Sequence, residues 1–128
     1  MKFLLDTHSL LWFLSGDASL SEKVRRIIEH PDYDILVSIA SLWEIAIKHS
    51  LGKLKLAQPF EELFPHQLSI NSISLLEIRP GHVARISSLP FHHRDPFDRL
   101  LTAQSLTEGV PLLSDDEALD AYGLERIW

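Results

Sequence analysis

No cysteine occurs among the 128 residues of the chain. The sequence can therefore form neither a disulfide framework nor a metal site built from thiolates. It also lacks any run that approaches the roughly 18 uninterrupted apolar residues of a membrane-spanning helix. We expect a protein that does not enter a membrane and that works in the reducing environment of the cytoplasm.

Features of a targeting signal are missing from the N-terminus. The stretch MKFLLDTHSLLWFLSG is apolar, but Asp6 and His8 interrupt it and no small-residue cleavage site follows. We interpret this stretch as a first strand and a first helix.

Positive charge is also in short supply. The chain has 12 lysines and arginines against 18 acidic residues, which gives a net charge of −6. Nucleic-acid-binding proteins normally show a basic face, so the net charge alone argues against one. Basic residues do gather at two places, first Lys48, His49, Lys53 and Lys55, and then His92, His93, Arg94 and Arg99. Such groups suit a solvated surface as well as contact with RNA, and the composition leaves both interpretations open.

The length of the chain and its hydrophobic pattern predict one α/β domain over residues 1–128. A chain of this size with 45% hydrophobic residues can bury one core. Apolar runs typical of strands occupy 1–5, 35–37, 71–78, 110–113 and 125–128. Patterns typical of helices occupy 9–14, 19–29 with Ser19 as the cap, 41–52 beginning at Ser41, 60–64, 80–89, 96–108 and 116–121. This alternation predicts a three-layer α/β/α fold with a mainly parallel sheet of about five strands.

Four acidic residues stand where one predicted element ends and the next begins. They are Asp6, Glu44, Asp98 and Asp116. The carboxyl ends of parallel strands meet at one edge of a sheet, and this edge is where such sheets bind ligands. Carboxylates gathered there repel one another unless a cation lies between them. Oxygen ligands of this kind favour Mg²⁺ or Mn²⁺ over zinc.

Each acid also has a purely structural interpretation. Three of them fit helix-capping patterns, namely Ser41 to Glu44, Asp95 to Asp98 and Ser114 to Glu117. Asp6 suits an Asx turn or the cap of a short helix. Taken singly, such residues are more often caps than ligands, and it is the joint pattern that favours a metal site.

Three segments carry a resemblance to a known family. The segments LLDTHSLLWFL, SIASLWEIAIK and HHRDPFDRLLTAQSLTEGVPLLSDD, followed by an apolar strand, resemble PIN-domain proteins, specifically VapC-type toxins of type II toxin–antitoxin pairs. The resemblance covers essentially the whole chain. It implies a Mg²⁺- or Mn²⁺-dependent endoribonuclease that cleaves RNA, is inhibited by a cognate VapB-type antitoxin and forms a homodimer.

The resemblance also assigns residues. The family's acidic quartet falls on Asp6, Glu44, Asp98 and Asp116. Asp98 is chosen over Asp95 because it precedes RLLTAQS, and Asp116 over Asp115 because it is the second residue after Ser114. Ser38 matches a small hydroxyl residue often found beside the quartet, although it could equally form a turn.

These assignments give a mechanism of metal-assisted phosphodiester hydrolysis. Asp6, Asp98 and Asp116 would position one or two ions, and Glu44 would assist the attacking water. Arg94 or Arg99 could guide phosphate, although an arginine in a first helical turn is more often a salt-bridge partner. The histidines His8, His92 and His93 are expected to be packing or surface residues and not ligands.

Two other classes of protein remain as alternatives. A phosphoacceptor domain on a similar sheet would need paired acids after the first strand and a lysine near its end, but the last lysine here is Lys55. A non-catalytic PIN-like module that binds a protein partner would not need an intact quartet. A nuclease assay with and without Mn²⁺ separates these alternatives from the ribonuclease.

Overall fold

A computed structural model describes all residues from Met1 to Trp128. Its centre is a five-stranded sheet with the order β3-β2-β1-β4-β5. The strands are β1 (Lys2–Leu5), β2 (Asp34–Ser38), β3 (Ile73–Leu76), β4 (Leu112–Leu113) and β5 (Arg126–Ile127). Every neighbouring pair is parallel, which confirms the predicted α/β class and makes the sheet entirely parallel.

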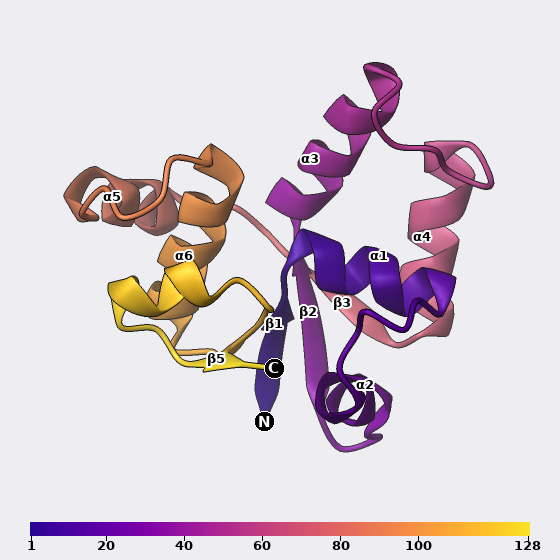
Figure 1. Ribbon diagram of the computed structural model, residues 1–128, viewed down its shortest axis with the longest axis horizontal. Coiled ribbons are helices and arrows are strands. Elements are labelled where there is room, and N and C mark those ends of the chain that lie inside the picture. The colour runs from indigo at the N-terminus through magenta and orange to yellow at the C-terminus, as the bar shows by residue number, and fades with distance from the viewer.

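Six α-helices and one short 3₁₀-helix connect the strands (Figure 1). They are α1 (Thr7–Ser15), α2 (Glu22–Glu29), α3 (Ile39–Ser50), α4 (Phe60–Ile70), α5 (Pro80–Ser88), α6 (Pro96–Glu108) and η1 (Glu117–Tyr122). None of these helices combines the length and the apolar character needed to cross a membrane.

Helices cover both faces of the sheet, as a three-layer fold requires. On one face α1 to α4 enclose the larger core, in which Leu10, Val24, Ile45 and Phe64 are fully or almost fully buried. On the other face α6 and η1 pack on the sheet through Leu101 and Leu119, and α5 lies against the outside of α6 (Figure 1).

The order of the strands determines where a ligand can bind. The chain builds β1, β2 and β3 in one direction, and then returns to place β4 on the other side of β1. Helices therefore leave the carboxyl ends of β1 and β4 toward opposite faces, and a crevice opens between them. The residues that follow these two strands therefore lie at that crevice.

Two predicted helix starts are wrong. Ser21 caps α2, because its Oγ accepts the Val24 N–H at 3.1 Å, whereas Ser19 lies in a turn and donates its own N–H to Asp17. Similarly α3 does not begin at Ser41. Ser38, the last residue of β2, caps it by accepting the Ala40 N–H at 3.0 Å, so strand and helix join without a loop.

The helix predicted over 60–64 continues to Ile70, although Pro65 lies inside it. Proline removes one backbone donor from a helix. Phe64 and Leu68 stand one turn apart and are both buried in the larger core. Their packing holds the helix together across the proline.

Candidate active site

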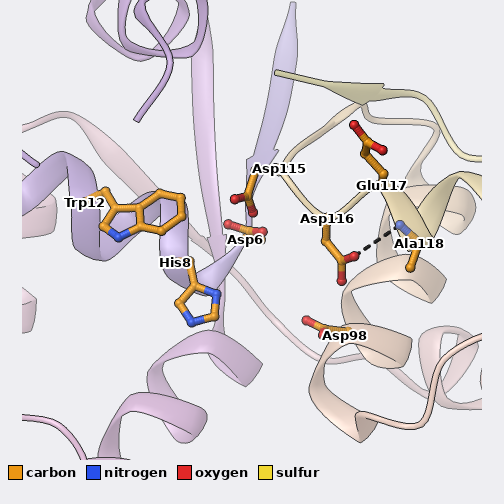
Figure 2. Close-up of a pocket in the computed structure, with 8 residues that line it drawn as sticks. All are labelled: Asp6, His8, Trp12, Asp98, Asp115, Asp116, Glu117 and Ala118. Carbon is orange, nitrogen blue, oxygen red and sulfur yellow. Dashed lines mark hydrogen bonds between the residues drawn. The ribbon is translucent and has the colours of Figure 1, made fainter. Parts of the chain in front are cut away.

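The crevice at the carboxyl ends of β1 and β4 is an open cavity of about 650 Å³. Most of the side chains around it are acidic (Figure 2). The lining residues are Asp6, His8, Trp12, Asp98, Asp115, Asp116, Glu117 and Ala118. The structure thus brings together three of the four acids that the sequence singles out.

Asp6 is positioned by the junction of β1 and α1. It is the N-cap of α1, and its Oδ1 accepts the Ser9 N–H at 2.8 Å. Burial raises the pKa of Asp6 above its ordinary value, and hydrogen bonds from Ser114 and Ser9 oppose this rise. The predicted capping role and a position in the cavity wall are therefore both realised by one side chain.

Asp98 lies in the first turn of α6. The cap of that helix is Asp95, whose Oδ1 accepts the N–H groups of Phe97 at 2.8 Å and of Asp98 at 3.1 Å. The Asp98 carboxylate is thereby left free to face the cavity. Burial raises the pKa of Asp98 to about 7, and the charge of Asp95 adds to this rise, as do Glu44 and Asp6 to a smaller extent, while His93 opposes it.

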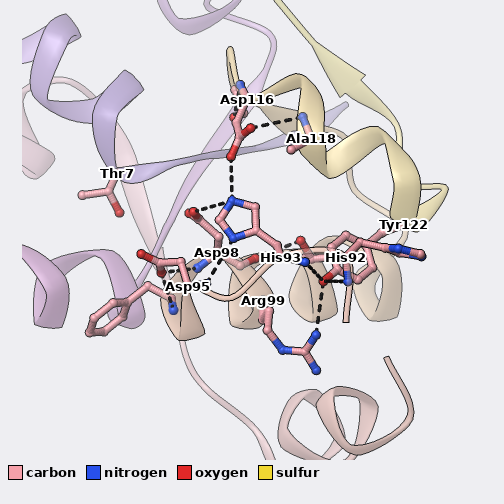
Figure 3. A network of polar contacts seen from close by, with 12 residues as sticks. Thr7, His92, His93, Asp95, Asp98, Arg99, Asp116, Ala118 and Tyr122 are labelled. Atoms are coloured by element: carbon pink, nitrogen blue, oxygen red, sulfur yellow. Dashed lines mark hydrogen bonds and ion pairs between the residues drawn. The ribbon is translucent and has the colours of Figure 1, made fainter. Parts of the chain in front are cut away.

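Asp116 approaches from the other side and stands three residues after Leu113, the last residue of β4. Its Oδ1 accepts the Ala118 N–H at 3.1 Å and so caps η1, and its own N–H donates to Ser114 Oγ at 3.1 Å. The second oxygen, Oδ2, points toward α6 (Figure 3). Asp115 also lines the cavity, but its side chain makes no hydrogen bond within the chain.

A histidine joins Asp116 to Asp98. The Nε2 atom of His93 lies 3.0 Å from Asp116 Oδ2 and 3.4 Å from Asp98 Oδ2 (Figure 3). One ligand atom from each of these three residues lies within 4.8 Å of the others, a separation that suits a metal ion. His93 was expected to be a packing or surface residue, and it is instead part of the acidic cluster.

Glu44 lies behind the cavity wall on α3. It is buried, and its Oε1 accepts the Thr7 hydroxyl at 2.7 Å while its Oε2 pairs with Lys48 Nζ at 2.7 Å. Thr7 follows Asp6 directly and also contacts the Ser41 hydroxyl at 3.0 Å. Glu44 is close enough to help raise the pKa of Asp98. The fourth acid thus belongs to the electrostatic environment of the cavity without lining it.

The three residues predicted to contact substrate lie in different environments. Ser38 is fully buried as the cap of α3. Arg94 is exposed in the loop before α6. Arg99 points away from the acids, because its guanidinium donates to Pro90 O at 2.9 Å and Tyr122 Oη at 3.1 Å and lies over the Phe91 ring. Of the three, only Arg94 keeps a free charged group.

Thr7, Lys48 and His93 are site residues that the sequence analysis did not assign. Lys48 had a local signal, since it stands four residues after Glu44 on a helix, a spacing typical of ion pairs. Thr7 is adjacent to Asp6, but its partner lies 37 positions away. Nothing local distinguishes His93 from His92.

The donor set suits a hard divalent cation. Three acids of the quartet line the cavity together with Asp115 and Glu117, and the only lysine or arginine in a salt bridge with any of the quartet is Lys48, which pairs with Glu44. Burial raises the pKa values of Asp6 and Asp98, and a cation bound beside these carboxylates would favour their charged forms. Carboxylate oxygens at such a site are the ligands that Mg²⁺ and Mn²⁺ take.

Fold and site together define an α/β protein with a carboxylate centre at the topological switch point of a parallel sheet. The profile of the PIN-domain family matches residues 3–124. The chain therefore belongs to the PIN-domain family.

Relatives and structural neighbours agree with this assignment. The ribonuclease VapC22 of Mycobacterium tuberculosis is 28% identical over 124 residues, which cover 93% of this chain and 90% of that protein. The fold resembles a chain of VapBC2 from Rickettsia felis bound to a DNA fragment from its promoter, with a TM-score of 0.75, 14% identity and coverage of 100% and 99% of the two chains. It also resembles a chain of DNA-bound VapBC from Salmonella typhimurium, with a TM-score of 0.73, 15% identity and coverage of 99% and 97%.

Proposed function

We propose that this single PIN domain is a Mg²⁺- or Mn²⁺-dependent endoribonuclease of the cytoplasm and the toxin of a toxin–antitoxin pair. The observation that carries the proposal is the meeting of Asp6, Asp98 and Asp116, from three separate parts of the chain, in one open cavity. The similarity to a ribonuclease over almost the whole length of both chains supports the same activity.

Asp6, Asp98 and Asp116 would hold the cation. A bound divalent cation lowers the pKa of water and stabilises the charge that develops on a phosphate during hydrolysis. The carboxylates of Asp6 and Asp116 each cap a helix, and Asp98 stands in the first turn of α6, so the starts of three helices carry the three carboxylates. Rigid carboxylates lose little conformational entropy when they bind a metal.

Glu44 has a different role. Thr7 and Lys48 hold both of its oxygens, so the carboxylate has a fixed orientation and a compensated charge. From this position it can orient a water through Thr7. A change of Glu44 should therefore affect catalysis more than the affinity for metal.

Positive charge lies next to the acids on the side of α3. A second cavity of about 260 Å³ shares His8 with the acidic cavity, and its lining includes Lys48 and Lys53. A phosphodiester backbone that entered the acidic cavity could rest its neighbouring phosphates there and against exposed Arg94. The net charge of −6 is compatible with such binding, because much of the acid is gathered where a cation would neutralise it.

The alternative functions have less support. A phosphoacceptor domain would need a lysine beside its acids, and no lysine lines the acidic cavity. A module that only binds protein would have no use for three acids of the quartet gathered in one open cavity.

An assay with purified chain tests the proposed activity. Unstructured RNA should be cut in the middle of the strand with Mg²⁺ or Mn²⁺ and left intact with EDTA. Asp98→Asn should abolish cutting, whereas Asp32→Asn, which removes an exposed acid outside the cavity, should not. Cutting that persists in EDTA, or that survives Asp98→Asn, would overturn the proposal.

The antitoxin would act at the same cavity. A segment that presents an arginine to a pair of carboxylates would compete with the cation, because guanidinium matches carboxylates in a bidentate geometry. Inhibition should then weaken as Mn²⁺ rises. Inhibition that is independent of the metal concentration, together with unchanged antitoxin binding by Asp98→Asn, would place the contact elsewhere.

A homodimer is part of the proposal. Large apolar side chains remain exposed on several elements, among them Trp43 on α3, which packs edge-on against Phe97 of α6. Exposed aromatic residues of this kind are enriched in protein interfaces. Light scattering on the purified chain should give twice the mass of 14.6 kDa, and a monomer would contradict this part of the proposal.

A further inference from the structure

His93 occupies an unusual position for a histidine in a cluster of oxygen ligands. Its Nε2 points at Oδ2 of Asp116 and at Oδ2 of Asp98, at 3.0 Å and 3.4 Å (Figure 3). Both oxygens belong to carboxylates that would hold the cation. The question is whether the imidazole is itself a metal ligand or a group that the cation replaces.

The other ring nitrogen answers this question. The backbone N–H of Asp95 donates to His93 Nδ1 at 3.1 Å, so Nδ1 is an acceptor and the ring proton is on Nε2. This proton is what the two carboxylates accept. For Nε2 to bind a metal, the proton would have to move to Nδ1, where it would face the Asp95 N–H and destroy that hydrogen bond.

The Asp95 N–H cannot easily turn away. Asp95 is the N-cap of α6 and is held there by the N–H groups of Phe97 and Asp98. The backbone of His93 is also held, because its N–H donates to Tyr122 Oη at 2.9 Å. The ring is thus anchored at Nδ1 and through its backbone, and only its Nε2–H is directed at the acids.

We propose that His93 is a positioning residue that takes the place of the divalent cation in the metal-free chain, donating Nε2–H to Asp98 and Asp116 without becoming a ligand. The inference rests on the proposed metal site. In this role His93 satisfies the two carboxylates while the cation is absent, and an incoming cation would have to take carboxylate oxygens over from the N–H group. The ligand set then consists of oxygen alone, which favours Mg²⁺ and Mn²⁺ over metals that prefer imidazole.

Three variants test the proposal. His93→Ala removes the donor, and His93→Gln keeps a donor but has no ring nitrogen. His92→Ala is the matched control, since the neighbouring ring packs on Tyr122 and not on the acids. The measurements are calorimetric titration with Mn²⁺ and thermal melting, the latter in EDTA and again in saturating Mn²⁺.

Removal of the donor should strengthen metal binding. Because the cation no longer competes with a charge-assisted hydrogen bond, His93→Ala should bind Mn²⁺ roughly three- to tenfold more tightly than wild type. Its melting temperature should fall by a few degrees (about 3–6 °C) in EDTA, where the two acids lose their donor, and should match wild type in Mn²⁺. His93→Gln should lie close to wild type, and His92→Ala should be unchanged in every measurement.

Weaker Mn²⁺ binding by His93→Ala would identify His93 as a ligand and overturn the proposal. Equal Mn²⁺ binding by His93→Ala and wild type would also overturn it, because it would show that His93 does not compete with the cation. These outcomes leave the proposed function intact as long as wild type binds Mn²⁺. Failure of wild type itself to bind Mn²⁺ would overturn both.

A measurement on the native chain is independent of the variants. In ¹⁵N-histidine-labelled protein, His93 should show the pattern of the Nε2–H tautomer before and after a Mg²⁺ titration, with a shifted Nε2–H signal in the loaded state. Conversion to the Nδ1–H tautomer on metal addition would show ligation and overturn the proposal.

Discussion

Two histidines of this chain have the same local hydrogen bonding and belong to regions with different tasks. His82, in the first turn of α5, accepts the Arg79 N–H on Nδ1 at 3.0 Å and places Nε2 2.7 Å from Glu108. His93, before α6, accepts the Asp95 N–H on Nδ1 at 3.1 Å and places Nε2 3.0 Å from Asp116. The bond that fixes the ring is a backbone N–H in both cases.

The surroundings of the two rings differ in charge balance. The His82 side chain is 1% exposed and faces one carboxylate, to which the Arg79 guanidinium also comes within 3.7 Å. That cluster is balanced and joins α5 to α6. The His93 side chain is 21% exposed and faces two carboxylates, neither of which forms a salt bridge with an arginine. An excess of acid around a histidine, and not the histidine itself, therefore distinguishes a binding site from a structural contact.

The largest expected difference between the two regions is in catalysis. Asp116→Asn should lower the rate of RNA cleavage at least roughly a thousandfold, because it removes several kcal/mol of metal-dependent stabilisation of the transition state. Glu108→Gln is the matched change in the other cluster and should leave the rate within a few-fold of wild type. Cleavage rates at saturating Mn²⁺ check both. A Glu108→Gln protein that folds but does not cleave would show that the His82 cluster also takes part in catalysis.

The next difference is in stability. His82→Ala should cost about 2–4 kcal/mol of the free energy of unfolding, because it leaves a cavity and deprives Glu108 and the Arg79 N–H of their partner. In metal-free protein, His93→Ala should cost less, about 1 kcal/mol, since its acids remain in contact with solvent. Urea unfolding in EDTA measures both values. Equal costs would show that His93 is as structural as His82.

Much of the acidic cavity was predictable from the sequence, because its position depends on where the strands end and on their order in the sheet. Asp6 directly follows one apolar run and Asp116 stands three residues after the end of another, and a parallel sheet must bring such residues to one edge. The prediction that Asp95 and not Asp98 caps α6 is confirmed, since Asp95 accepts the first N–H groups of that helix. These features are local, or follow from the topology that the alternation of strands and helices predicts.

The side-chain contacts around the acidic cavity were not predictable from the sequence, because they depend on packing between distant elements. His92 and His93 are neighbours of the same type, and only the turn before α6 decides which of them faces Asp116, 23 residues away. Similarly, Ser41 and Ser38 both fit the cap of α3, and the direct junction of β2 with α3 selected Ser38. Side-chain pairing of this kind is determined in the folded state and leaves no signal in a single sequence.

A smaller effect concerns stability and pH. The pKa of Asp98 is raised to about 7, so between its unfolded value of 3.8 and 7 the folded chain binds a proton more tightly than the unfolded chain. Stability from this group is therefore present at acidic pH and is lost as pH rises through 7. In metal-free protein at pH 8, Asp98→Asn should add about 1–2 kcal/mol to the free energy of unfolding, a value reduced from the full shift because solvent reaches the carboxylate.

The same variant should show almost no gain at pH 4, where Asp98 of the wild type is already protonated. Urea unfolding in EDTA at the two pH values measures this, and Glu108→Gln serves as the control from the balanced cluster, for which no such gain at pH 8 is expected. A gain of equal size at both pH values would assign the effect to packing and not to charge.

The smallest expected effect concerns Asp95, which caps α6 and whose charge also raises the pKa of Asp98. Asp95→Ala removes the cap of α6, which should cost about 1 kcal/mol, but it keeps the backbone N–H that fixes His93. Asp95→Ala also removes the charge that, after burial, contributes most to the raised pKa of Asp98. At pH 8 the variant should therefore recover part of the stability that it loses with the cap. Cleavage should stay within a few-fold of wild type, with the acidic limb of its pH profile moved to lower pH, because Asp98 then ionises more readily. Melting curves at pH 5 and pH 8 and cleavage rates over the same interval test this, and a protein that retained its stability but lost cleavage would show that Asp95, and not Asp98, binds the cation.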